Sequence, residues 1–283
     1  MIDSLPDRLL DTLCRMALAE DVGDGDATTL AIVPENLPIT AFFTTREKCV
    51  CCGLPIVKKL YQILDKYVEV SCLVGEGEFC AEGTRLATIH GNARAIITGE
   101  RIALNFLQHL SGIATTTSKY VEALGNSKTR LLDTRKTIPG MRLAEKYAVA
   151  KGGGQNHRIG LFDMVMIKDN HRTVANLLDK DGIENAVKAC RAKYPKLKVE
   201  VEADTLEDVE AAVKAKADIV MFDNMSNEMM RQALKITDGK CKTEASGGIT
   251  LERLPSMANL GLDYISVGAL THSVKAIDIG LDM

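Results

Sequence analysis

The spacing of apolar residues divides the chain into two parts with different patterns. In the first part, residues 4–20 carry leucines at helical spacing, which predicts an amphipathic helix. Shorter elements are expected after it, with strands over 39–45, 67–74 and 86–89 and a helix over 55–64. Glycines separate these runs as turns, and residues 98–124 predict one or two further helices. The pattern indicates a small N-terminal α+β domain over residues 1–110.

From residue 130 onward, apolar runs typical of buried strands alternate with helical segments. Six strands are expected, over residues 129–133, 164–167, 198–202, 219–222, 242–245 and 264–267. Repeated strand–helix units form parallel sheets, and six of them favour a barrel, or part of one, over a flat nucleotide-binding sheet. The predicted class is therefore α/β, with an open or incomplete α/β barrel over residues 111–283. Its final helix could return to the N-terminal domain.

Composition narrows the classes of protein to which this chain can belong. Of its 283 residues, 46% are apolar and 26% are charged, which is typical of globular proteins and excludes disordered and collagen-like chains. The net charge of −3 and the 4% aromatic content argue against nucleic-acid binding. No apolar run is long enough to span a membrane, and no signal peptide is recognisable. The eight cysteines lack disulfide or zinc-site spacing, which predicts reduced thiols and a cytoplasmic protein, with Cys49, Cys51 and Cys52 in a strand and the turn after it.

Polar residues or glycines follow every predicted strand of the second part. In parallel α/β folds the active site is built at the carboxyl ends of the strands. In chain order, these ends carry Asp133 to Lys136, Lys168 to His171, Glu202, Asp223 with Asn224, Ser246 to Gly248, and Gly268 with Ala269. We therefore expect the active site at this edge of the sheet.

Positive charge is concentrated around the first two of these strand ends. Residues 133–172 hold eight Lys and Arg residues against four acids, within a chain of net negative charge. Lys168 directly follows an apolar run, so it is expected at the mouth of the barrel, as are Arg135 and Lys136. Converging Arg and Lys side chains suit a ligand that carries several carboxylates or phosphates. By contrast, the charged residues at 142, 146 and 151 are expected on a solvated helix face.

The last two strand ends have the features of a phosphate site. Ser246, Gly247 and Gly248 precede a helical segment, so the backbone can approach an anion and offer it N–H groups. Residues 267–269 stand at the next strand end, and barrels commonly bind phosphate at their last two strands. Glu202 and Asp223 remain as acids among cations. They could bind ribose hydroxyls, hold Mg²⁺ beside phosphates, or form structural ion pairs.

Several of these stretches resemble one known family. They are residues 20–26 (EDVGDGD), 99–105 (GERIALN), 133–142 (DTRKTIPGMR), 152–160 (GGGQNHRIG), 167–171 (IKDNH), 222–224 (FDN) and 244–248 (EASGG). In this order they are similar to the quinolinate phosphoribosyltransferases, also called nicotinate-nucleotide pyrophosphorylases (carboxylating). One departure is Ile138, where the family usually has threonine.

The resemblance implies an enzyme of de novo NAD biosynthesis, a pentosyltransferase. It would transfer the phosphoribosyl group of phosphoribosyl pyrophosphate to quinolinate with decarboxylation, giving nicotinate mononucleotide, pyrophosphate and CO₂. Mg²⁺ would be required, and the chain would form a homodimer or a multiple of one. Nucleic acid and membrane would not be partners.

The resemblance also assigns roles to individual residues. Lys136, Lys168, Glu202 and Asp223 would be catalytic, and the last two would serve the metal through phosphoribosyl pyrophosphate. The substrate-binding set would be Arg101, Thr134, Arg135, Lys136, His157, Arg158, Lys168, Glu202, Asp223, Ser246, Gly247, Gly248, Val267, Gly268 and Ala269. Within it, Arg101 would enter the site of the partner subunit.

Three other functions are compatible with parts of the pattern. A nicotinate phosphoribosyltransferase-like enzyme would act without decarboxylation, but it needs fewer cations around the ring than this chain offers. An aldolase would use Lys168 as a Schiff-base nucleophile. A nucleic-acid-binding module would use residues 133–172, which the net charge of the chain opposes.

Overall fold

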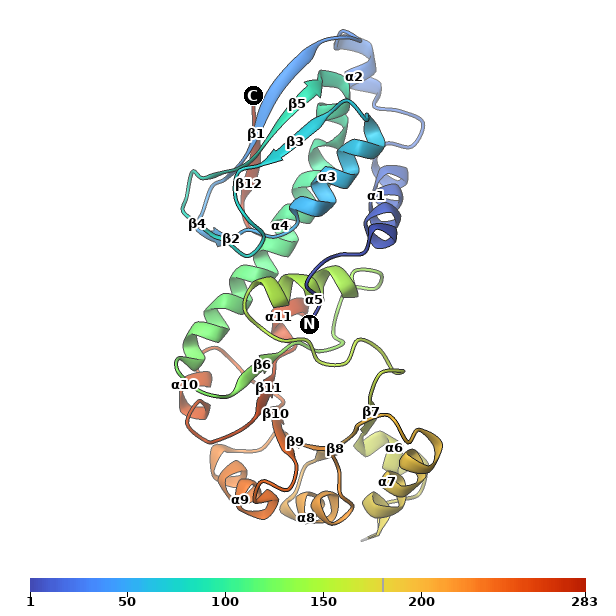
Figure 1. Ribbon diagram of the computed structural model, residues 1–283, viewed down its shortest axis with the longest axis vertical. Helices are drawn as coiled ribbons and strands as arrows, with labels where there is room; N and C mark the ends of the chain where they lie inside the picture. The colour runs from blue at the N-terminus through green and yellow to red at the C-terminus, as the bar shows by residue number, and fades with distance from the viewer. Residues whose placement is uncertain (180) are drawn as a thin grey trace. The chain divides into compact units, whose positions relative to one another are not determined.

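The computed structural model describes residues 1–179 and 181–283, which form two compact units. The first unit comprises residues 1–118, 138–153 and 270–283, and the second comprises residues 119–137 and 154–269. The chain thus passes between the units several times, whereas the sequence pattern suggested a single division at residue 110. Each unit is built around its own sheet (Figure 1).

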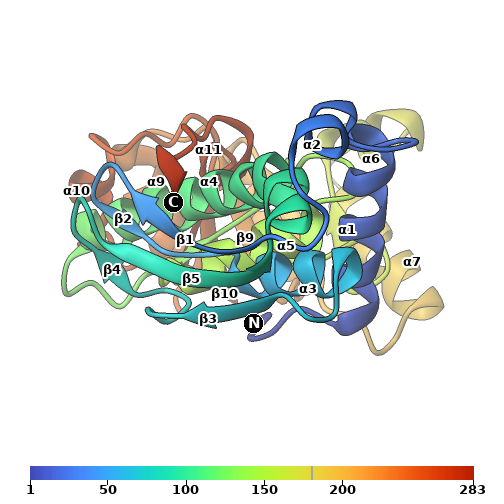
Figure 2. The same cartoon turned by 90° about the horizontal axis from the view of Figure 1, so that it is seen from above.

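The first unit contains a four-stranded antiparallel sheet. Its order is β12 (Ile279–Asp282), β1 (Pro38–Thr45), β5 (Arg85–Asn92) and β3 (Glu69–Cys72). Helices α1 (Asp7–Asp21), α3 (Leu54–Leu64) and the start of α4 (Ala93–Leu124) lie on one side of this sheet (Figures 1 and 2). The predicted strands and helices of this part are confirmed, and residues 98–124 belong to one long helix.

A half-buried carboxylate fixes the start of α3. Glu76 accepts hydrogen bonds from the main-chain N–H groups of Gly53, at 3.0 Å, and Leu54, at 2.9 Å. These are two of the N–H groups that a helix start leaves without internal partners. Ahead of the helix, β2 (Cys49–Val50) pairs with β4 (Phe79–Cys80), and Cys51 and Cys52 form the turn, as predicted. All eight cysteines are free thiols.

The end of the chain differs from its prediction. The final element is the strand β12, which pairs antiparallel with β1, and not the helix that the sequence suggested. The end therefore does return to the first unit, but as an edge strand of its sheet. None of the helices within 1–179 and 181–283 is long and apolar enough to cross a membrane.

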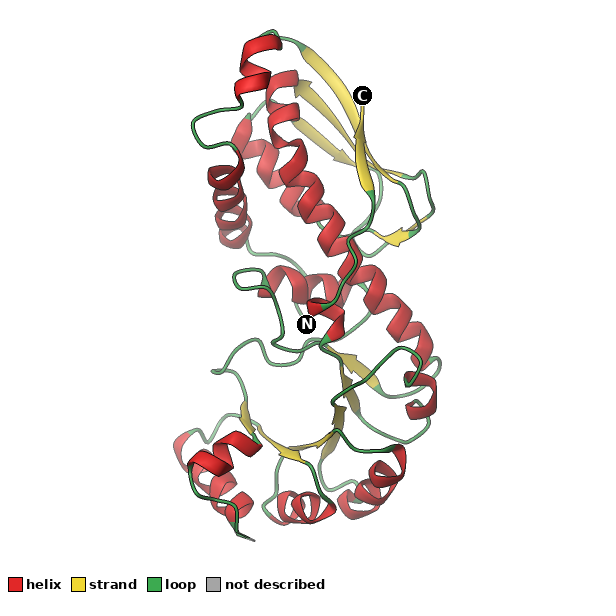
Figure 3. Ribbon diagram, turned by 180° about the vertical axis from the view of Figure 1, so that it is seen from behind, coloured by secondary structure: helices red, strands yellow, loops and turns green. Residues whose placement is uncertain are grey.

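The second unit contains six parallel strands that form an open arc with helices on its outer side (Figure 3). The order is β6 (Arg130–Leu132), β11 (Tyr264–Ser266), β10 (Lys242–Ser246), β9 (Ile219–Asp223), β8 (Val199–Ala203) and β7 (Val165–Ile167). All six predicted strands are confirmed. Among the described residues β6 and β7 are the two edges of the sheet, which makes the barrel incomplete, as expected.

The helices α7 (Gly182–Lys193), α8 (Leu206–Lys214) and α9 (Asn227–Thr237) return the chain between strands. Thr205 caps α8 by accepting a hydrogen bond from the Asp208 N–H group at 3.1 Å. Ser226 caps α9 in the same way, through the Met229 N–H group at 3.2 Å. These caps place each helix start directly after a strand end.

The remaining helices are short: α2 (Ala27–Ile32), α5 (Arg142–Lys151), α6 (Asp169–Val174), α10 (Leu254–Met257) and α11 (Ala269–His272). On α5 one prediction is wrong, because Lys146 is fully buried and does not lie on a solvated face. The adjacent Glu145 is also buried, and its carboxylate contacts His109 Nε2 at 3.0 Å. Charged residues of α5 thus pack inside the first unit.

Candidate active site

The parallel sheet brings the carboxyl ends of its strands, with their polar residues, to the same end of the sheet. Asp223 pairs in register with Ser246 on the neighbouring strand, and Leu132 pairs with Ser266. All predicted site residues from Thr134 to Ala269 belong to this unit. Most lie at, or directly after, these ends, whereas His157 and Arg158 follow Gln155, which bridges to Leu132 at the end of β6. Arg101 is the exception, because it is exposed on α4 within the first unit.

Lys168 and Glu202 form an ion pair at the ends of β7 and β8. Lys168 Nζ donates to Glu202 Oε2, and the carboxylate side chain is only 10% exposed. The main-chain N–H of Lys168 also donates to Nδ1 of His171, at 3.0 Å, which fixes the turn into α6. The lysine is therefore held as a charged group at the strand mouth.

Two further acids, Asp204 and Asp223, lie near Glu202. Burial, and then the negative charges of Glu202 and Asp204, raise the pKa of Asp223, whereas Lys168 and Lys136 act in the opposite direction. Burial and the charge of Glu202 also raise the pKa of Asp204. Carboxylates that raise one another's pKa are stabilised by an added cation, and hard oxygen ligands are those that Mg²⁺ prefers. Among the described residues, however, the ligand atoms of these three carboxylates do not converge into a metal-binding cluster.

Asn224 joins the ends of β9 and β10. It adopts a left-handed conformation with φ of 53°, and its main-chain N–H donates to the Ser246 carbonyl at 3.0 Å. Its side-chain amide donates to Asp223 Oδ2 at 2.7 Å. Sequence reasoning did not assign Asn224 a role. Asparagine at a strand end was the available signal, since asparagine tolerates this backbone conformation better than most residues.

Two consecutive glycines at the end of β10 are needed for the backbone path. Gly247 has φ of 85° and Gly248 has φ of 58°, a region that disfavours side chains. A Cβ atom on Gly247 would clash with Asn224, whereas no atom lies within 4 Å of the same position on Gly248. The turn at Gly248 can thus expose its backbone to a ligand, and its role as a phosphate cradle stays a prediction.

The segment after β6 is tied to residues 154–158. Asp133 accepts hydrogen bonds from Asn156 Nδ2, at 2.7 Å, and from the His157 N–H group, at 2.8 Å. Next to it, the Thr134 hydroxyl accepts a hydrogen bond from the Lys136 N–H group at 3.0 Å. These bonds shape the turn that carries Arg135 and Lys136.

His157 is held within the sheet by two acids. Its Nε2 atom lies 3.2 Å from Glu200 Oε2 and 3.4 Å from Glu244 Oε2, and both glutamate side chains are fully buried. Its Nδ1 atom accepts a hydrogen bond from the Arg158 N–H group at 2.7 Å. Burial lowers the pKa of His157, but the two carboxylates more than offset this and raise it. Sequence reasoning missed both glutamates, because they lie inside strands and not at their ends.

Arg158 and Arg135 bring two positive charges together. Arg158 donates from NH1 to the Met164 carbonyl at 3.0 Å, which anchors its guanidinium beside β7. Burial, and then the positive charge of Arg135, lower the pKa of Arg158. Two guanidinium groups that disfavour each other's charge favour an anionic ligand between or beside them.

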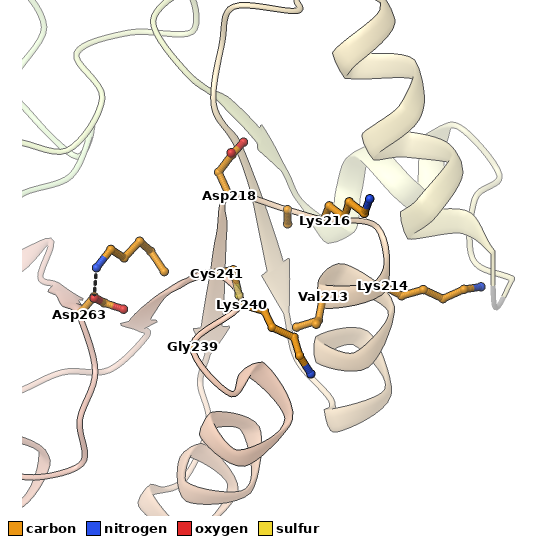
Figure 4. Close-up of a pocket in the computed structure, with 10 residues that line it drawn as sticks. Val213, Lys214, Lys216, Asp218, Gly239, Lys240, Cys241 and Asp263 are labelled. Carbon is orange, nitrogen blue, oxygen red and sulfur yellow. Dashed lines mark hydrogen bonds and ion pairs between the residues drawn. The ribbon is translucent and has the colours of Figure 1, made fainter.

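A hollow lies at the amino ends of the strands, opposite the candidate site (Figure 4). It has a volume of about 720 Å³ and is lined mainly by residues at or just before the starts of β9 and β10, among them four lysines. Lys242 Nζ contacts Asp263 at 2.6 Å, and Lys214 pairs with Glu184 at 2.9 Å. Because it lies at the amino ends of the strands, this hollow is separate from the candidate site.

Family models cover almost the whole chain. The model for the quinolinate phosphoribosyl transferase N-terminal domain matches residues 26–111, and the model for the C-terminal domain matches residues 113–282. The chain belongs to the quinolinate phosphoribosyltransferase family. The family resemblance of its motifs is thereby confirmed.

Individual relatives agree with this family. A probable nicotinate-nucleotide pyrophosphorylase (carboxylating) of Bacillus subtilis is 42% identical over 264 residues, 93% of this chain and 90% of the relative. A chloroplastic nicotinate-nucleotide pyrophosphorylase (carboxylating) of Arabidopsis thaliana is 39% identical over 292 residues, 96% of this chain and 82% of the relative. The solved nicotinate-nucleotide pyrophosphorylase of Francisella tularensis superposes with a TM-score of 0.93 at 43% identity, covering 100% of this chain and 98% of that one.

A more distant solved structure shares the fold alone. Human nicotinic acid phosphoribosyltransferase superposes with a TM-score of 0.65 at 12% identity, covering 96% of this chain and 73% of that one. Architecture therefore does not distinguish the two activities, and the residues of the site must do so.

Proposed function

We propose that this protein transfers the phosphoribosyl group of phosphoribosyl pyrophosphate to quinolinate with loss of CO₂. The products are nicotinate mononucleotide and pyrophosphate, and the reaction is a step of de novo NAD biosynthesis. The observation that carries this proposal is the proximity of the positive charges of Arg135 and Arg158 in a chain of the quinolinate phosphoribosyltransferase family.

The charge of the site matches quinolinate better than nicotinate. Quinolinate carries two adjacent carboxylates, and two planar guanidinium groups can each bind one in a bidentate manner. The charge of Arg135 destabilises the charged form of Arg158. A ligand with two negative charges therefore stabilises this pair of cations more than a ligand with one. The nicotinate-specific alternative leaves one of these cations without a partner in the substrate.

Phosphoribosyl pyrophosphate would bind at the neighbouring strand ends. The turn at residues 246–248 and the strand end at 267–269 would hold its phosphate, with Lys136 adding positive charge. Glu202 and Asp223 would bind the ribose hydroxyls and, with the nearby Asp204, a Mg²⁺ ion. When bound, Mg²⁺ would supply charge neutralisation to the pyrophosphate leaving group.

The protein's own groups mainly position the reactants. The ribose carbon becomes electron-poor as pyrophosphate leaves, and the fixed carboxylates of Glu202 and Asp223 stabilise that charge. The ring nitrogen then forms the new bond. The positive charge of the resulting pyridinium stabilises the electron pair left on the adjacent ring carbon as CO₂ departs, and that carbon then takes a proton from water. No covalent enzyme intermediate is needed. Lys168 is paired with Glu202 as a cation, so a Schiff-base aldolase mechanism is disfavoured.

The assembly proposed here is a homodimer, or a multiple of one. Arg101 is exposed on α4 next to the buried Ile102 and Ala103. We infer that this arginine completes the site of the other subunit, which a two-fold dimer makes reciprocal. The cytoplasmic location stays a prediction that rests on the free thiols.

Separate assays with quinolinate and with nicotinate test the function. The protein would be mixed with phosphoribosyl pyrophosphate, Mg²⁺ and either quinolinate or nicotinate, and pyrophosphate release would be followed. We expect turnover with quinolinate and none with nicotinate. Equal turnover of both acids, or turnover of nicotinate alone, would assign the nicotinate-specific activity instead.

A further inference from the structure

The backbone of Asn224 has a conformation that its place in the fold does not explain. Asn224 directly follows β9 and has φ of 53°. Among the described residues, the other non-glycine residues with positive φ are Asn176, Lys216 and Asp238. Each of these three lies within two residues of the end of a helix, where a left-handed residue commonly ends the helix. Asn224 ends no helix, so its conformation requires another cause.

The left-handed turn brings the side chain of Asn224 back beside Asp223. Consecutive residues of an extended strand point to opposite faces, so their side chains do not normally meet. Here Asn224 Nδ2 donates a hydrogen bond to Asp223 Oδ2 at 2.7 Å. A sparsely populated backbone conformation that is held by its surroundings often serves a function. The conformation of Asn224 serves a contact with an acid of the candidate site.

Asn224 is also tied to the turn at the end of β10. Its main-chain N–H donates to the Ser246 carbonyl at 3.0 Å. Its Oδ1 atom lies in the space that a Cβ atom on Gly247 would occupy. Glycine at position 247 therefore makes room for the asparagine side chain. One residue thus contacts both the acid at the end of β9 and the glycine turn at the end of β10.

The chemistry of the amide determines which way it faces. An ionised carboxylate only accepts hydrogen bonds, whereas an amide donates at its nitrogen and accepts at its oxygen. Nδ2 therefore faces Asp223, and Oδ1 faces Gly247. The reverse orientation would place the amide oxygen against the carboxylate. Aspartate has the same size as asparagine but lacks the donor, so it could not replace Asn224 in this contact.

The carboxylate of Asp223 lies where its orientation matters. It is half-buried, and charges of both signs act on it. These charges belong to Glu202, Asp204, Lys168 and Lys136. Without a fixed donor, the carboxylate can turn toward the lysines or away from the other acids. The bond from Asn224 to Oδ2 fixes the plane of the carboxylate and hence the direction of Oδ1.

We propose that Asn224 is a positioning residue that holds Asp223 and the turn at residues 246–248 in one arrangement for phosphoribosyl pyrophosphate. Asn224 acts through these two groups and not through a bond to the substrate. This inference rests on the proposed function, because it assigns Asp223 to the ribosyl group and the turn to phosphate. Both groups serve the same substrate, so loss of Asn224 should weaken donor binding and spare quinolinate binding.

Two variants at position 224 separate the hydrogen bond from the shape of the side chain. Glycine and aspartate both tolerate the left-handed conformation, so both variants should fold. Asn224→Gly removes the donor and should raise the KM for phosphoribosyl pyrophosphate by about 10-fold. Asn224→Asp should raise it further, because a second carboxylate then faces Asp223. The KM for quinolinate should stay within about 2-fold of the wild type in both variants.

The order of the two variants distinguishes positioning from packing. If the side chain only filled the space beside Gly247, Asn224→Asp would behave as wild type and Asn224→Gly would be the damaged variant. Asn176→Gly is the matched control, because it makes the same replacement at a left-handed asparagine just beyond α6. It should leave both KM values unchanged. Wild-type kinetics in Asn224→Asp, or equal increases in both KM values in Asn224→Gly, would overturn the proposal.

A binding measurement separates this inference from the proposed function. Phosphoribosyl pyrophosphate with Mg²⁺ would be titrated into the wild type and both variants without an acceptor, and thermal unfolding would show that each protein is folded. We expect Asn224→Asp to bind at least about 10-fold more weakly than the wild type. Equal affinities would overturn the role of Asn224. Failure of the wild type to convert quinolinate would overturn the proposed function alone, because this comparison does not depend on the acceptor.

Discussion

A side chain added at Gly247 should weaken the binding of phosphoribosyl pyrophosphate. The structure allows the size of this loss of affinity to be worked out. Gly247 has φ of 85°, and a Cβ atom there would clash with Asn224. Asn224 cannot move freely, because its amide donates to Asp223 Oδ2 at 2.7 Å. Gly247→Ala therefore strains the backbone and also displaces the group that orients Asp223.

The two effects have different sizes and different consequences. An L-residue in the left-handed region costs about 1–2 kcal/mol of stability. Loss of the Asn224 hydrogen bond to the charged Asp223 costs about 1.5–3 kcal/mol, because one partner is ionised. If that bond serves to hold Asp223 for the ribosyl group, the dissociation constant for phosphoribosyl pyrophosphate should rise about 10- to 100-fold.

Gly239→Ala provides the matched control for this prediction. Gly239 has φ of 70°, and no atom lies within 4 Å of its added Cβ, so the variant suffers the backbone strain without the clash. Thermal unfolding measures the loss of stability, and calorimetry with phosphoribosyl pyrophosphate and Mg²⁺ measures the loss of affinity. Gly247→Ala should lose more stability than Gly239→Ala, because it adds the clash with Asn224 to the backbone strain, and only Gly247→Ala should lose affinity. Wild-type affinity in Gly247→Ala would refute the placement of the donor at this turn.

Two further predictions concern cations. Lys168→Ala should lower kcat/KM by about 100-fold, or about 3 kcal/mol, and Lys168→Arg should not rescue it, because a planar fork cannot replace the ammonium that pairs with Glu202. Steady-state kinetics check this, with Lys240→Ala in the opposite hollow as a control that should behave as wild type. Arg101→Ala and Lys136→Ala should each be nearly inactive, but refolding them together should restore about a quarter of the wild-type activity per site, because mixed dimers contain one intact site. If mixed dimers form but no activity returns, Arg101 acts in the site of its own subunit or lies outside the site.

Most of the barrel could be predicted from the sequence because its signals are local. Strands such as β7 and β9 are apolar runs, and helix starts such as Thr205 carry their own caps. The strand β12 could not be predicted in this way. It has four residues, one of them glycine, and its partner β1 is far away in the chain, so only tertiary pairing defines it.

The site was predictable where it lies at strand ends and not where it lies inside strands. Lys168, Glu202 and Asp223 follow apolar runs, and the parallel topology places such positions together. Glu200 alternates with valines, a pattern that usually marks a solvent-facing position on a strand. In this sheet the polar face points inward to His157, which the period of the strand alone does not reveal. The buried Lys146 was misplaced for a similar reason, since charge alone favours exposure.

The most direct test of the central claim is the fate of the quinolinate 2-carboxylate. Quinolinate labelled with ¹³C at that carboxylate would be incubated with the protein, phosphoribosyl pyrophosphate and Mg²⁺, and labelled CO₂ and pyrophosphate would be quantified. We expect one labelled CO₂ for each pyrophosphate and each nicotinate mononucleotide formed. Pyrophosphate release without labelled CO₂, or no reaction with quinolinate under conditions in which nicotinate reacts, would contradict the account.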